Sequence, residues 1–197
     1  MILAIPVFCL LLASAGSARA LIQEAGMGIV YGKDHAFSLT APKGWMLDNE
    51  SGLEQGVYAA FYPKGRTWKD SHVVAYARSR PRNENISSVE DVVKDTVAIF
   101  HQEGNPNYKA EKVTTLTTPS GKEAVIYHFQ GDKWGNKEAA AYFPENKTIN
   151  FIVLNCRDER DFEVALGPFE ELINSYMFMG DDPLGKKSET KERTGEP

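Results

Sequence analysis

The chain has 197 residues, of which 42% are hydrophobic and 25% are charged, and its formal net charge is -5. This length favours one domain built around one ordinary core. Lys and Arg are scattered along the chain rather than massed, which argues against a surface that follows phosphates, so we expect no nucleic-acid partner.

Residues 1–20 have the pattern of a secretory signal peptide. An apolar run, Ile2–Ala13, is followed by small residues up to Ala18-Arg19-Ala20, which is typical of a cleavage site. The run is shorter than the ~20 apolar residues that a spanning helix needs. No Lys or Arg precedes it, so retention as an anchor is the alternative to cleavage. We expect a periplasmic or secreted protein with no stable membrane span after cleavage.

Cleavage would remove Cys9 and leave Cys156 as the one cysteine of the mature chain. A single thiol predicts no internal disulfide. Because Cys156 ends an apolar run, we expect a buried, inert thiol; intermolecular pairing and a reactive thiol are the alternatives.

The first β-rich segments precede any helical pattern. They are His35–Thr40, Gly56–Tyr62 and His72–Arg78. The loop 63–71 joins the last two as a hairpin.

A first helix follows these strands. Ser87 and Glu90 form a capping-box pattern at its start, and Gly104 ends it as a C-cap. Apolar residues recur between these two points at spacings of three and four, which predicts one buried face.

Four more strands come next, joined by short turns. They are Tyr108–Thr117, Glu123–Gln130, Lys137–Phe143 and Thr148–Asn155. In the second and the fourth, both sets of alternating side chains are largely apolar, which predicts strands that are covered on both faces.

A second helix is predicted from about Arg160 to Met177, with Asp158 as its cap. Gly167-Pro168 lies inside its apolar stripe and predicts a kink or a break. The folded domain is therefore expected over 21–180. The charged segment 181–197 is expected to be a disordered tail.

The order of these elements predicts the fold class. Short turns within each run of strands require a mainly antiparallel sheet. Two amphipathic helices and a sheet that is apolar on both faces predict an α+β, three-layer α/β/α sandwich. Its central sheet has about six or seven strands, with one long helix on each face.

Several segments resemble PsbP-like proteins. Phe37-Ser-Leu-Thr-Ala-Pro-Lys-Gly-Trp45 is similar to the strand, Pro, Gly-Trp opening of that family, and Gly121–Tyr127 and the closing helix through Ser175-Tyr176 are also similar. The resemblance implies the same sandwich. The family includes an extrinsic subunit of the photosynthetic oxygen-evolving complex, assembly factors, a Ran-binding import factor of related fold and exported bacterial proteins. It has no shared catalytic motif, so no catalytic residue is carried over.

No catalytic, nucleotide-binding or local metal-binding motif occurs in the sequence. We therefore expect a non-enzymatic protein without cofactor or metal. The alternative is a metal-dependent or hydrolytic periplasmic enzyme that uses His72, His101 or His128.

Two predicted hairpin loops share one composition. Lys64–Asp70 and Gly131–Lys137 each place a tryptophan among glycine, cations and an acid. A helix of ~15 residues is about 22 Å long, so it crosses a short strand once and returns the chain to its starting end. Following the chain direction then predicts that both loops lie at one end of the sheet.

These loops have two interpretations. Each indole either covers the end of the core, or belongs to a recognition surface for a protein partner in the cell envelope or outside the cell. The binding residues of the second interpretation are Trp68, Trp134, Arg66, Lys69 and Lys133. Trp45, in a Pro-Lys-Gly-Trp turn, is expected to be structural.

Overall fold

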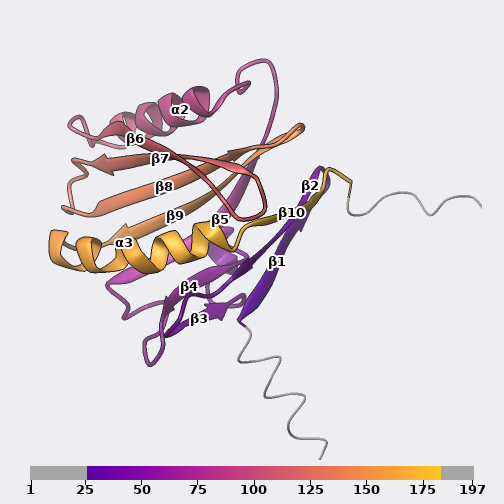
Figure 1. The fold of residues 1–197 in the computed structure, drawn as a ribbon. Coiled ribbons are helices and arrows are strands. Elements are labelled where there is room, and N and C mark those ends of the chain that lie inside the picture. Colours follow the sequence, from indigo (N-terminus) through magenta and orange to yellow (C-terminus); the bar gives the residue numbers. More distant parts are fainter. Residues whose placement is uncertain (1–25, 183–197) are drawn as a thin grey trace, which may run out of the picture.

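The computed structural model describes residues 26–182, so the predicted signal peptide and the predicted tail from residue 183 onward lie outside the described residues. A seven-stranded antiparallel sheet has the order β3-β4-β5-β9-β8-β7-β6 (Figure 1). Its strands are β3 (Trp45–Asp48), β4 (Ala60–Pro63), β5 (Val73–Pro81), β6 (Lys109–Thr117), β7 (Glu123–Gln130), β8 (Lys137–Pro144) and β9 (Thr148–Cys156). A three-stranded sheet has the order β1-β2-β10, with β1 (Met27–Gly32), β2 (His35–Thr40) and β10 (Met177–Gly180).

One helix packs on each face of the large sheet, as predicted. Helix α2 (Val89–Gln102) covers a cluster that includes Ala140 and Tyr142 of β8. Helix α3 (Glu159–Asn174) covers a cluster that includes their neighbours Ala139 and Ala141. Because successive side chains of a strand point to opposite faces, the two clusters lie on opposite sides of the sheet. The predicted fold class is confirmed.

The caps of the helices agree with the sequence, with one shift. Asp158 accepts a hydrogen bond from the Asp161 amide at the start of α3, as predicted. At the start of α2, Ser88 rather than Ser87 is the cap, and its partner in the capping box is Asp91 rather than Glu90. Ser87 remains just outside the helix, where its amide and hydroxyl donate to the same Asp91 carboxylate.

The second helix differs from its prediction at two points. It runs from residue 159 to residue 174 without a break at Pro168. The carbonyl that a proline leaves without a donor belongs to Val164, whose side chain is 73% exposed, so water can reach this side of the helix. The helix ends before Met177, which is instead the first residue of β10.

The N-terminal part was predicted least well. The segment His35–Thr40 forms a strand, but in the small sheet, and the strand predicted over Gly56–Tyr62 begins only at Ala60. Neither β1 nor β3 was predicted. Strand β1 contains two glycines, and a Cβ at Gly28 would lie 2.8 Å from a methyl group of Leu47, so a larger residue there would require the Leu47 side chain to move. Trp45 is 7% exposed in the core, so its structural role is confirmed.

The two faces of β9 are covered unequally. On the α3 face, Ile152, Leu154 and Cys156 are fully buried. On the α2 face, Phe151 and Val153 are only half-buried, so the prediction that β9 is covered on both faces is wrong for this side. A helix with its side chains is about 10 Å wide and strands lie about 4.8 Å apart, so one helix covers two or three strands of seven. The small sheet completes the cover on the α3 face, where Phe37 and Leu39 of β2 join the cluster.

No helix among residues 26–182 has the length and apolar character needed to cross a membrane.

Candidate functional site

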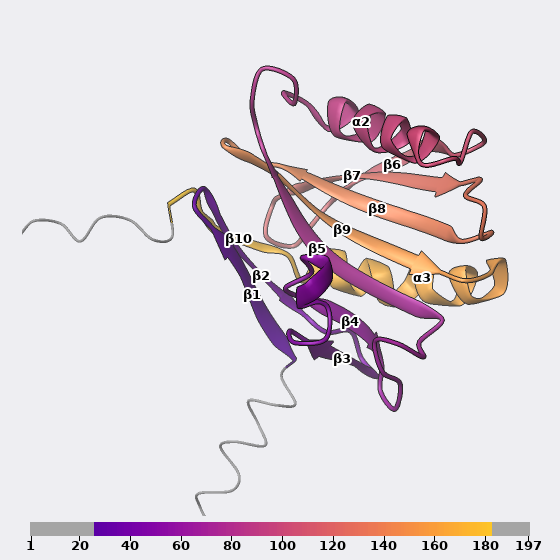
Figure 2. The same ribbon diagram turned by 180° about the vertical axis from the view of Figure 1, so that it is seen from behind.

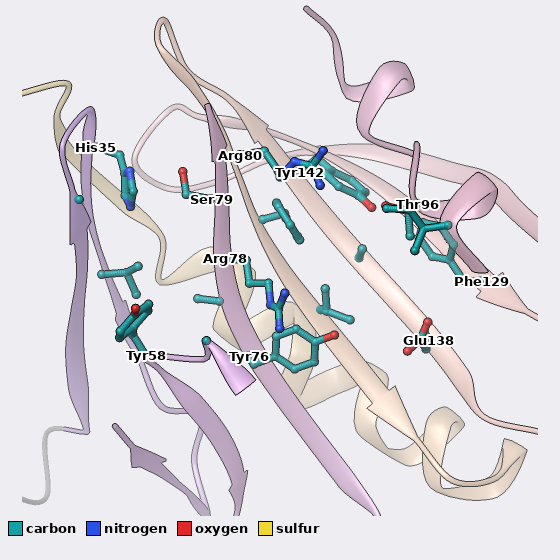
Figure 3. Close-up of a pocket in the computed structure, with 18 of the residues that line it drawn as sticks. His35, Tyr58, Tyr76, Arg78, Ser79, Arg80, Thr96, Phe129, Glu138 and Tyr142 are labelled. Atoms are coloured by element: carbon teal, nitrogen blue, oxygen red, sulfur yellow. The ribbon is translucent and has the colours of Figure 1, made fainter. Parts of the chain in front are cut away.

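The uncovered part of the α2 face forms a cleft with a volume of about 680 Å³ (Figure 3). Strands β5, β9 and β8 form its floor. Helix α2 forms one wall, and the β1–β2 hairpin together with the segment after the short helix η1 (Leu53–Gln55) forms the other. The helix and the hairpin lie on either side of β5 and β9 in both views of the fold (Figures 1 and 2). A volume of this size is typical of pockets that hold small organic ligands.

The registers of the strands define the floor of the cleft. Tyr76 of β5 lies opposite Val153 of β9, which lies opposite Ala140 of β8. The next row along the strands contains Phe151 and Tyr142. Because Ala140 ends at its Cβ, the middle of the floor is lower than the rows on either side of it. The floor is therefore an apolar recess bordered by aromatic rings.

Two tyrosine hydroxyls in this recess are unpaired. Burial raises the pKa of Tyr76 and of Tyr142 above the ordinary value of 10.0, so both phenols keep their protons at neutral pH. Among residues 26–182, neither hydroxyl has a side-chain or main-chain partner within hydrogen-bond distance. Neither hydroxyl oxygen is fully enclosed, because Asp181 Oδ1 is the only buried side-chain polar atom without a partner among residues 26–182. Both hydroxyls are therefore open to bond to a group outside the chain.

Arg78 brings an available positive charge to the cleft. Its Nη2 donates a hydrogen bond to the Gln55 carbonyl oxygen at 3.0 Å, and its guanidinium lies 5.5 Å from the centroid of the Tyr76 ring. Arg80, further along β5, instead forms an ion pair with Asp95 of α2 at 2.6 Å. No carboxylate of the described part of the chain lies within ion-pair distance of Arg78.

A buried carboxylate marks the opposite side of the cleft. Glu138 of β8 accepts a hydrogen bond from the Tyr108 hydroxyl and another from Asn155 Nδ2, the latter at 2.5 Å. Burial raises the pKa of Glu138 above its ordinary value, and this effect outweighs the two hydrogen bonds, which act in the opposite direction. Figure 3 shows Arg78 and Tyr76 on one side of β9 and Glu138 on the other, so the cleft has a cationic side and an acidic side.

The two tryptophan loops lie at the same end of the sheet, as the chain direction predicted. Cys156, the last residue of β9, pairs with Val73 on one side and with Lys137 on the other. The Trp68 loop leads into Val73 and the Trp134 loop leads into Lys137. Strand β9 lies between the strands that carry the two loops, so the strand ends from which they emerge are two strand spacings, about 10 Å, apart.

The loop that carries Trp134 is well ordered by its own side chains. The Asp132 carboxylate accepts hydrogen bonds from the amides of Trp134 and Asn136, and the Lys133 amide donates to Asn105 Oδ1. The indole is 63% exposed, and Lys133 Nζ lies 4.5 Å from the centre of its ring. The interpretation of Trp134 as a cover for the core is therefore wrong.

The other predicted contact residues lie in the first loop. Trp68 is half-buried, while Arg66 and Lys69 are exposed on either side of it. None of the five predicted contact residues lines the cleft. Sequence reasoning therefore missed the cleft. The sequence did contain an indication of the cleft. Strand β9 has apolar side chains on both faces, and one helix is too narrow to cover a whole face of a seven-stranded sheet.

The three histidines of the enzymatic alternative lie in different surroundings. His72 is exposed, and its Nδ1 lies 3.5 Å from Asp161 Oδ2. His101 Nε2 lies 2.7 Å from the Tyr108 carbonyl oxygen. The half-buried His128 packs edge-on against Phe162 with ring centroids 5.1 Å apart, and burial lowers its pKa.

A group of three side chains with metal-ligating atoms does occur within residues 26–182. It combines His72 with Asp158 and Asp161, whose ligand atoms lie within 4.8 Å of one another. It contains one histidine only, and one oxygen of Asp158 already accepts the Asp161 amide as the helix cap.

Cys156 is fully buried. Burial, with the nearby acidic groups Asp161, Asp158 and Glu138, raises the pKa of its thiol to about 12, so the thiolate is scarce at neutral pH. This agrees with the expectation of a buried thiol.

No protein-family model matches this chain, and no curated protein matches it. Among solved structures, cyanobacterial PsbP (CyanoP) from Synechocystis sp. PCC 6803 is similar over 79% of this chain and 94% of its own, with 13% identity and a TM-score of 0.48. A protein from Bacteroides thetaiotaomicron VPI-5482 is similar over 77% of this chain, with 12% identity and a TM-score of 0.39, and this chain spans 47% of that protein. Likeness at this level concerns the path of the chain and not its ligands.

Proposed function

We propose that this protein is an exported, non-catalytic binding module that holds a small ligand in the cleft on the α2 face of its sheet. The observation that carries the proposal is that Phe151 and Val153 of β9, a central strand, are only partly buried on the α2 face. Apolar side chains in the middle of a sheet are ordinarily covered, because each exposed methylene group forgoes about 0.8 kcal/mol. A ligand that covers Phe151 and Val153 would recover that free energy.

The polar groups of the cleft support binding rather than chemistry. The hydroxyls of Tyr76 and Tyr142 keep their protons, and Glu138 is already held by two donors. A nucleophile activated by a neighbouring base is the usual requirement for hydrolysis. The cleft does contain a hydroxyl beside a carboxylate, Tyr108 with Glu138, but burial raises the pKa of the Tyr108 phenol, so this hydroxyl is not activated as a nucleophile. These groups are arranged to recognise a ligand.

The test is to fill the cleft without disturbing the rest of the molecule. Val153→Tyr places a ring in the recess above Ala140, while Val164→Tyr makes the same change on the exposed surface of α3. The neutral dye N-phenyl-1-naphthylamine fluoresces when it enters an apolar site. We expect saturable binding to wild type and to Val164→Tyr, and an affinity at least about tenfold lower for Val153→Tyr. Equal binding by all three proteins would contradict the proposal.

A second candidate function is contact with a protein partner of the cell envelope through the two tryptophan loops. The observation in its favour is Trp134, a largely exposed indole on a loop fixed by Asp132 and Asn105. Exposed aromatic side chains beside cations are common anchors of protein contacts. The charges of Arg66, Lys69 and Lys133 would favour an acidic partner.

This second function is tested by replacing Trp68 and Trp134 with Ala together and measuring co-purification of envelope proteins. The double variant is expected to fold and to lose its partner. Recovery of the same proteins with a folded double variant would exclude these loops as the contact surface. Both functions require export, which is tested by determining the N-terminal residue of the mature protein; Leu21 is expected.

A further inference from the structure

The cleft differs chemically from one side to the other, and this difference specifies the class of its ligand. On the β5 side, Arg78 carries a positive charge without a carboxylate partner in the described part of the chain. On the β8 side, the Glu138 carboxyl already accepts hydrogen bonds from Tyr108 and Asn155 and offers an anion no positive charge. A ligand with one anionic group is therefore held in a single orientation, with the anion at Arg78.

The position of Arg78 is fixed before any ligand arrives. The Gln55 carbonyl oxygen holds one arm of the guanidinium, and the Tyr76 ring lies beneath it. The remaining N–H donors of the planar guanidinium form a fork that suits a carboxylate or a sulfonate. His35, on the hairpin wall of the cleft, has its pKa lowered by burial, so it adds little competing positive charge at neutral pH.

The middle of the cleft favours rings over flexible chains. Eight of its 21 lining residues are Tyr or Phe, and the recess at Ala140 is bordered by the rings of Tyr76, Tyr142 and Phe151. Aromatic rings stack on one another with a free energy beyond that of the buried area alone. The free hydroxyls of Tyr76 and Tyr142 can donate to oxygen or nitrogen atoms on the body of the ligand.

We infer that the cleft takes a ring-containing, largely apolar monoanion, such as an aromatic carboxylate, whose anionic group binds Arg78 and whose rings lie over Val153 and Ala140. This inference rests on the proposed function, because it names the ligand class of the same cleft.

Two dyes with almost the same rings test the inference. 8-Anilinonaphthalene-1-sulfonate carries one negative charge, and N-phenyl-1-naphthylamine is its neutral counterpart. We expect wild type to bind the anionic dye about tenfold more tightly than the neutral one, as one charge-assisted contact provides. Arg78→Gln should remove this preference and leave the neutral dye unaffected, and Arg78→Lys should keep part of it. Dodecanoate, an anion without rings, should compete with the anionic dye much less well than 1-naphthoate.

Two matched variants show whether the dyes bind elsewhere on the molecule. Arg66→Gln removes an exposed cation of the Trp68 loop and should change the affinity of neither dye. Val113→Ser removes an apolar side chain, 50% exposed, from the edge strand β6, where dyes could also adhere, and it too should change neither affinity. A loss of dye binding in either variant would place the dyes outside the cleft and contradict the inference.

The outcomes separate the two proposals. If neither dye binds, or if Val153→Tyr leaves both unchanged, the proposed function fails. If Val153→Tyr abolishes binding but Arg78→Gln weakens both dyes equally or neither, the cleft stands and the anionic ligand class is wrong. Equal competition by dodecanoate and naphthoate would overturn the preference for rings.

Discussion

The two faces of the large sheet share the same strands but differ in how they are closed. On the α3 face, a buried polar network has all its partners: the Tyr176 hydroxyl donates to Glu145 at 3.1 Å and accepts from Asn150 at 2.9 Å, and Lys122 pairs with Glu145 at 2.6 Å. On the α2 face, the hydroxyls of Tyr76 and Tyr142 have no partner among the described residues. The α3 face therefore mainly stabilises the fold. The α2 face leaves apolar side chains and two hydroxyls free to contact a ligand.

The largest difference in stability is expected between alanine variants of two phenylalanines on adjacent strands. Phe143 is fully buried on the α3 face and stacks on Tyr176 with ring centroids 3.7 Å apart, whereas Phe151 is half-buried on the α2 face. Phe143→Ala should lower the free energy of unfolding by about 3–5 kcal/mol, because it leaves a cavity. Phe151→Ala should lower it by about 1–2 kcal/mol, because this ring is only partly buried and its removal widens an existing cleft instead of creating a closed cavity. Urea titration measures both, and equal losses would contradict the comparison.

Two buried tyrosines, one on each face, allow the two faces to be compared by removing a single hydroxyl. Tyr176 and Tyr142 are 1% and 2% exposed. Tyr176→Phe should lower the free energy of unfolding by about 1–3 kcal/mol, because Asn150 and Glu145 each lose a hydrogen bond to the Tyr176 hydroxyl. Tyr142→Phe should change stability by less than about 0.5 kcal/mol, because no hydrogen bond is lost. A large loss for Tyr142→Phe would mean that its hydroxyl serves the fold rather than a ligand.

Glu138, on the α2 face, should make the free energy of unfolding depend on pH. Because burial raises its pKa, the folded protein keeps the Glu138 proton to a higher pH than the unfolded chain does. The stability contributed by this group is complete below the ordinary pKa of 4.5 and is lost as the pH rises through the folded pKa. As the pH rises above 4.5 and through the folded pKa of Glu138, wild type should therefore lose more unfolding free energy than Glu138→Gln does. Parallel curves from urea titrations of the two proteins would show that the pKa of Glu138 is not shifted.

The smallest effect is expected at Cys156, whose thiol should not react in the native protein. Cys156 lies on the closed face with a pKa of about 12. A maleimide should label this thiol only after unfolding, at a native-state rate at least about 100-fold below that of a free cysteine. Rapid labelling of the native protein would favour the alternative of a reactive thiol.

Elements with strong periodic patterns were predictable from the sequence. The strand over Glu123–Gln130 has the predicted bounds, and Asp158 caps α3, because alternation and capping chemistry are local. The strand β1 was missed because Gly28 and Gly32 lie within its six residues, and glycine weakens the sequence pattern of a strand. The shift of the cap from Ser87 to Ser88 has a local cause too: Asp91 bonds to both serines, and adjacent serines leave the pattern ambiguous.

The site was less predictable than the fold. Chain direction correctly placed the Trp68 and Trp134 loops at one end, because strand parity requires only the order of the elements. The cleft depends instead on how far α2 and the small sheet extend over β5 and β9, and no local pattern records that extent. Apolar residues such as Phe151 and Val153 suit a position covered by a helix as well as one covered by a ligand, so their identity does not distinguish the two cases.

The most direct test of an open α2 face is the reactivity of two thiols on one strand. Val153→Cys places a thiol in the cleft, and Cys156, three residues further along β9, faces the closed side. Mass spectrometry of the native variant after brief exposure to a maleimide should find one label, at residue 153, and an occupying dye should slow its addition. A native variant in which residue 153 is as unreactive as Cys156 would contradict the account.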